Sequence, residues 1–170
     1  MNARDLAFAH VGFGLAAIAV GAVVLLRRKG TGIHRIIGYT YVGCILGVNT
    51  TALAMHRFIG TIGPFHLFVL ISLVCTGVGF YHAFSKRPPG RWLEGHYYGM
   101  CFSYVGLLAA TMAEILVRVP YFKAHLSGWR QVALAVLSAF IVGIAGQVII
   151  TRSRERILAT VAPGPVRPSP

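Results

Sequence analysis

Seven histidines and four acidic residues carry most of the chemistry open to this chain. An imidazole can ligate a metal, serve as an axial ligand of haem, or relay a proton near neutral pH. Four ionisable groups are expected near the outer ends of the apolar segments: His10, His56, His66 and Glu114. A second set is expected near the inner ends: His34, His82, Glu94 and His96.

The outer set predicts a metal site. Its expected ligands are His10, His66 and Glu114, with His56 as a fourth candidate. Two histidines and a carboxylate suit zinc or iron, and imidazoles also suit copper. The cofactor is therefore expected to be one of these transition metals or, on the second hypothesis, haem b.

Paired histidines from different helices are also the ligands of b-type haem. His82 and His96 would form the inner pair, and His10 and His66 the outer pair. One observation opposes a two-haem path. His66 and His82 are sixteen residues apart, about 160° around an ideal helix, so they cannot both face one interior axis.

A third hypothesis is a proton or solute path. At about 100° per residue, His96, Ser103 and Glu114 fall on one face of a helix. Such a polar stripe normally faces the protein interior in a membrane. A purely structural role for these residues competes with all three hypotheses. Glu114 and Arg118 are four residues apart, so their charges can neutralise each other on one helix face. The histidines at helix ends can simply be exposed to water.

Five apolar runs must position these residues. They span 7–26, 36–55, 64–84, 97–117 and 132–150. Each is near the ~20 residues that a helix needs to cross ~30 Å of hydrocarbon. The chain is 56% hydrophobic and only 12% charged. We therefore predict an all-α polytopic membrane bundle of five transmembrane helices over residues 1–151. Residues 152–170 are basic and proline-rich, which predicts a disordered cytoplasmic tail.

The net charge of +12 is unevenly distributed along the chain. Eleven of the sixteen basic residues lie between the first and second apolar runs, between the third and fourth, or after the fifth. These three segments lie on the same side of the membrane. This asymmetry places the N-terminus outside and the C-terminus in the cytoplasm of a bacterial inner membrane. Anionic lipid headgroups are the expected partners of the basic loops, and no nucleic-acid site is expected.

Three stretches resemble a large family of bacterial membrane proteins of unknown function. Residues 34–41 resemble its His-Arg-x-x-Gly-x-x-Tyr signature, and residues 63–67 resemble its Gly-Pro-x-His-Leu segment. Residues 96–118 are similar to a motif of one branch. The resemblance implies a compact helical membrane domain and supplies no activity. It also implies that a shared pattern includes His34, His66, His96 and Glu114.

Taken together, the residues favour an intramembrane metal or haem b site used in redox chemistry or metal handling. The alternatives are a proton-coupled carrier of small solutes and a structural or assembly subunit. An assembly subunit would bind a membrane-protein partner, and a homo-oligomer is equally compatible with the sequence. No Walker loop, dinucleotide fingerprint or nucleophile elbow is present.

Overall fold

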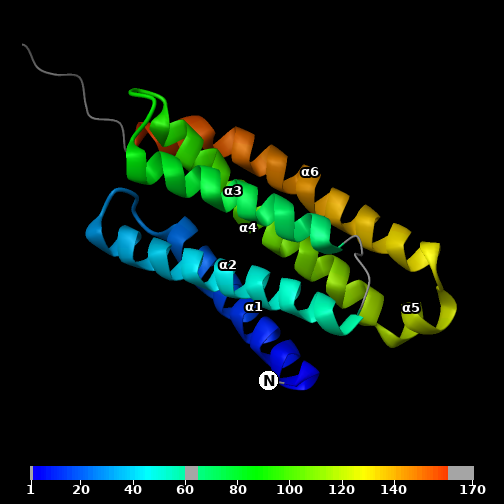
Figure 1. The fold of residues 1–170 in the computed structure, drawn as a ribbon. Coiled ribbons are helices and arrows are strands. Elements are labelled where there is room, and N and C mark those ends of the chain that lie inside the picture. The colour runs from blue at the N-terminus through cyan, green and yellow to red at the C-terminus, as the bar shows by residue number, and fades with distance from the viewer. Residues whose placement is uncertain (1, 60–64, 161–170) are drawn as a thin grey trace, which may run out of the picture.

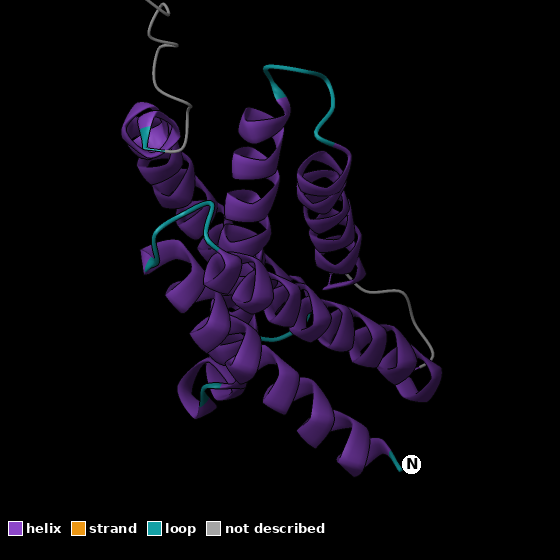
Figure 2. Cartoon of the chain, turned by 90° about the vertical axis from the view of Figure 1, so that its left-hand side faces the viewer, coloured by secondary structure: helices purple, strands orange, loops and turns teal. Residues whose placement is uncertain are grey.

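Six helices make up the described part of the chain, and five are long and apolar enough to cross a membrane. The computed structural model describes residues 2–59 and 65–160, without the side chains of 56–59 and Phe65. The helices are α1 (Ala3–Leu26), α2 (Gly32–Ile59), α3 (Phe65–Ser85), α4 (Trp92–Arg118), α5 (Pro120–His125) and α6 (Trp129–Ala159). These residues contain no strand (Figure 2). The predicted all-α, five-span fold is confirmed.

The first four helices form two hairpins. α1 packs closely along α2, and α3 packs closely along α4, whereas the hairpins meet through sparser contacts of α2 with α3 and of α1 with α4 (Figure 1). α2 and α4 thus occupy opposite corners of a four-helix arrangement. Among the long helices, α6 packs mainly against α4. We call the end of the bundle that carries residues 27–31 and 86–91 the inner end.

The ends of α1 satisfy their own backbone groups. Asn2 accepts a hydrogen bond from the Asp5 amide at 2.8 Å, and the Asp5 carboxylate accepts one from the Asn2 amide, which is a capping box. At the inner end, the Lys29 ammonium donates to the carbonyl oxygens of Val24 (2.8 Å) and Leu25 (2.6 Å). A cation there also complements the negative end of the helix dipole.

Glycines bring α3 and α4 together. A Cβ atom built on Gly99 would lie 2.5 Å from the Cα of Gly79 and 2.9 Å from the carbonyl oxygen of Cys75. Such backbone-to-backbone approach is the usual role of small residues between membrane helices. The hairpin therefore closes only because position 99 has no side chain.

α6 extends further than the sequence predicted. The expected tail began at residue 152, but the helix continues to Ala159. Two contacts hold the end of α6 against α4: just before this last part the Tyr97 hydroxyl donates to the Ile150 carbonyl at 2.8 Å, and within it Arg154 pairs with Glu94 at 2.6 Å. The polar composition suggested disorder, whereas the ion pair and the packing of Leu158 keep the segment helical. Residues 161–170 lie outside the described residues.

We expect Gly99→Ala to destabilise the bundle by about 1–3 kcal/mol, since the added methyl group must push two backbones apart. Gly106→Ala is the matched control, because a Cβ on Gly106 of the same helix meets no atom within 4 Å. The midpoint of thermal unfolding in detergent measures both changes. Equal midpoints for the two variants would contradict the close approach of α3 and α4.

Candidate functional site

Two histidines face each other at the inner end, one from α2 and one from α4. The ring centroids of His34 and His96 are 6.4 Å apart, with their planes at 88°. The Nδ1 of His96 lies 2.9 Å from the carbonyl oxygen of Gly79, to which it must donate. This bond fixes the orientation of the ring and leaves the lone pair of Nε2 available to bind a ligand. The Nδ1 atom of His34 is buried without a hydrogen-bond partner.

Equal depth explains why these two rings meet. His34 is the third residue of α2 and His96 the fifth of α4, and both helices begin at the inner end. Seven residues later the same two helices meet again, through Tyr41 and Ser103. A seven-residue step returns to within about 20° on a helix, so both contacts use the same face of each helix.

A buried polar cluster occupies the middle of the bundle. The hydroxyl of Ser103 lies 3.0 Å from the Tyr41 hydroxyl and 2.6 Å from that of Thr76, which joins α2, α3 and α4. All three residues are almost fully buried. Nearby, the Asn49 amide donates to the Ser72 hydroxyl at 3.1 Å. These bonds satisfy groups that would otherwise be costly to place in hydrocarbon.

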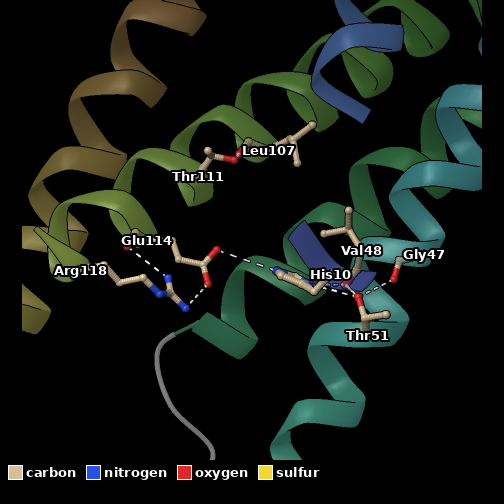
Figure 3. Close-up of polar contacts among 8 residues, drawn as sticks. All are labelled: His10, Gly47, Val48, Thr51, Leu107, Thr111, Glu114 and Arg118. Carbon is tan, nitrogen blue, oxygen red and sulfur yellow. Dashed lines mark hydrogen bonds and ion pairs between the residues drawn. The ribbon is translucent and has the colours of Figure 1, made fainter. Parts of the chain in front are cut away.

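At the outer end, one carboxylate lies between two basic side chains (Figure 3). Glu114 Oε1 is 2.7 Å from the Arg118 guanidinium, and Oε2 is 3.9 Å from Nε2 of His10. The His10 side chain is 15% exposed and that of Glu114 is 32% exposed. The predicted pairing of Glu114 with Arg118 is therefore present, and His10 joins it from α1.

The other nitrogen of His10 is also engaged. Its Nδ1 lies 3.0 Å from the Thr51 hydroxyl and 3.2 Å from the Val48 carbonyl (Figure 3). The Thr51 hydroxyl donates its own hydrogen to a carbonyl of α2, so the imidazole must be the donor. With Nδ1 donating to α2, Nε2 is the nitrogen that faces the Glu114 carboxylate.

The predicted outer metal ligands are only partly placed. His10 and Glu114 lie side by side, His66 is the second residue of α3, and the His56 side chain lies outside the described residues. Within the described residues, no three His, Cys, Asp or Glu side chains converge as a metal site requires. The four-ligand set thus stays a prediction, with one pair of its members in contact.

At the inner end, the ring contact of His96 is with His34, whereas the sequence paired His96 with His82. The His82 imidazole lies against Gly95, and its Nδ1 bonds the carbonyl oxygen of Arg87. That bond ties the 86–91 connection to α3. His34 was expected at this level, but only the starting points of α2 and α4 could have indicated its pairing with His96.

Residues 7–151 match the model of the family described as "Predicted membrane protein (DUF2306)". The chain belongs to this family. The match includes most of α6 as well as the 34–41, 63–67 and 96–118 stretches, and so extends beyond the resemblance found in the sequence. Comparison with curated proteins and with solved structures gave no match. The family establishes a membrane protein of unknown function.

Ser103→Ala should destabilise the protein by roughly 0.5–2 kcal/mol, because it leaves the Tyr41 and Thr76 hydroxyls without their shared partner. Thr111→Ala is the control, since that hydroxyl bonds only the Leu107 carbonyl of its own helix. In a double-mutant cycle, Tyr41→Phe should cost less in the Ser103→Ala background than in the wild type. Strict additivity would show that the two hydroxyls do not interact.

Proposed function

We propose that this protein binds b-type haem at the inner end of its bundle, with His34 and His96 as the two axial ligands, and that it transfers electrons. The observation that carries the proposal is the His34–His96 pair. Two imidazoles on opposite sides of one iron, each bonded at about 2 Å, have ring centroids roughly 6 Å apart. The separation of 6.4 Å fits that requirement.

The number of available ligands favours haem over a bare metal ion. A protein site for zinc or iron needs three or four side chains, whereas haem supplies four nitrogens and needs two. The described residues offer pairs of histidines and carboxylates but no group of three. The hydrogen bond from His96 to Gly79 is the kind of support that orients a ligating imidazole.

The arrangement of the helices also supports a cofactor between the hairpins. Cofactors of helical bundles are held by side chains on facing helices, and His34 and His96 come from opposite corners. Gly38 lies one turn after His34, and a Cβ there would meet no atom within 4 Å. A planar ring system could therefore approach the α2 backbone on this side.

Haem would supply reversible one-electron chemistry, and the chain would supply its ligands and an apolar surrounding. The basic connections at the inner end favour a bacterial inner membrane in which this end, and the haem with it, lies on the cytoplasmic side and the N-terminus lies outside. An electron donor or acceptor would then approach from the cytoplasmic side.

The test is a reduced-minus-oxidised absorbance spectrum of the full-length protein, purified in detergent from cells supplied with iron and a haem precursor. We expect Soret and α bands from about one haem per chain. His34→Ala and His96→Ala should each lose at least nine-tenths of the signal. His82→Ala is the matched control, because it removes an inner-end imidazole held by the loop, and it should keep the bands.

A flat spectrum of the correctly folded wild-type protein would overturn the haem proposal. Bands that survive His34→Ala but vanish in His82→Ala would instead restore the pairing of His82 with His96. Circular dichroism of each variant separates loss of haem from loss of fold.

A second candidate function is proton transfer through the bundle, as part of a proton-coupled carrier. It is supported by the polar side chains that follow one face of α4, where His96, Ser103 and Glu114 each contact another helix. Hydroxyl groups of Tyr41 and Thr76 extend this line between the two ends. Relays of this composition carry protons in membrane proteins.

Protein reconstituted into liposomes should then dissipate an imposed pH gradient, measured with an internal pH-sensitive dye. Glu114→Gln should lower the proton flux at least tenfold, because the amide cannot bind and release a proton. Glu94→Gln is the control, since Glu94 pairs with Arg154 away from the line. Flux equal to that of empty liposomes in the wild type would remove this candidate.

A further inference from the structure

Lys29 is a basic residue near the inner histidine pair. It lies in the connection between α1 and α2, and its side chain folds back so that the ammonium contacts the end of α1. The side chain is half-buried. It lies close enough to interact electrostatically with His34, His96 and the Cys101 thiol of α4.

The ammonium of Lys29 has a donor to spare. It carries three N–H groups, and two of them donate to the Val24 and Leu25 carbonyls. Among the residues that the structure describes, no carboxylate pairs with it. Burial lowers the pKa of this ammonium below its ordinary value, so an anion in contact would stabilise the charged form.

We propose that Lys29 is an anion-binding residue of the inner site, and that its ligand is a propionate carboxylate of the haem. This inference rests on the proposed function and assigns one further contact within it. Haem bears two carboxylates, which cannot remain in hydrocarbon without a cation or water. Lys29 offers a fixed cation beside the proposed axial ligands, at the end of the bundle where the polar interface begins.

The position of Lys29 fits this role better than those of its neighbours. Arg27 and Arg28 are exposed, and they make no ion pair among the described residues. The two carbonyl bonds hold the Lys29 ammonium in place before any ligand arrives. Preorganisation of this kind reduces the cost of ordering a long, flexible side chain. A carboxylate would complete the set of three acceptors around the ammonium.

The test compares two ligands. Full-length protein made in haem-deficient cells is titrated in detergent with haem b and with haem b dimethyl ester, in which neither propionate carries a charge. Wild-type protein should bind the ester at least tenfold more weakly. In Lys29→Gln, both ligands should bind with the same affinity. Arg28→Gln is the matched control and should keep the wild-type preference.

Each outcome decides something different. If the wild-type protein binds both ligands equally, the carboxylate contact is wrong while the haem site stands. If it binds neither, the proposed function fails and this inference fails with it. Lys29→Arg provides a variant that keeps the cation, and it should retain a preference for the free acid. A preference in Lys29→Gln equal to that of the wild type would overturn the assignment.

Discussion

Hydrocarbon offers no hydrogen bonds, and this constraint shapes the bundle. Polar side chains at membrane depth must find partners within the protein, because water cannot satisfy them. The interior face of α4 meets the requirement three times. His96 bonds the backbone of α3, Ser103 bonds hydroxyls of α2 and α3, and Glu114 faces His10 of α1. These contacts fix the rotation of α4, around which the other long helices pack.

Two kinds of packing follow from that face. Within the α3–α4 hairpin, Gly79 and Gly99 bring the backbones into contact. Between the hairpins, large or polar side chains such as Tyr41 hold the helices further apart. Close backbone packing and two hydrogen bonds, from His96 to the Gly79 carbonyl and between Ser103 and Thr76, stabilise the first interface, whereas side-chain contacts such as that of Tyr41 with Ser103 specify the second. A cofactor is more easily accommodated in the second.

The two ends of the interior face differ in their chemistry. At the outer end, the Glu114 carboxylate pairs with the Arg118 guanidinium at 2.7 Å, so its charge is already compensated. At the inner end, one nitrogen each of His34 and His96 is available to a ligand, and no described carboxylate pairs with the nearby Lys29 ammonium. Available imidazole nitrogens and a cation without a carboxylate partner indicate a binding site more strongly than an ion pair whose charges already neutralise each other. The proposed haem therefore belongs to the inner end.

The sequence by itself determined the fold class, because five apolar runs of spanning length have no other stable arrangement in a bilayer. It also identified the polar face of α4, since helical periodicity depends only on spacing. Only the tertiary structure decided which partners this face meets. His34 and His96 are sixty-two residues apart, and their contact depends on how two hairpins are joined, which local spacing does not encode. The same holds for the end of α6. The composition of residues 152–159 predicts a tail, but the ion pair of Arg154 with Glu94 holds them against α4. Local pattern sets the depth and face of each side chain, and the packing of helices from distant parts of the chain sets its neighbours.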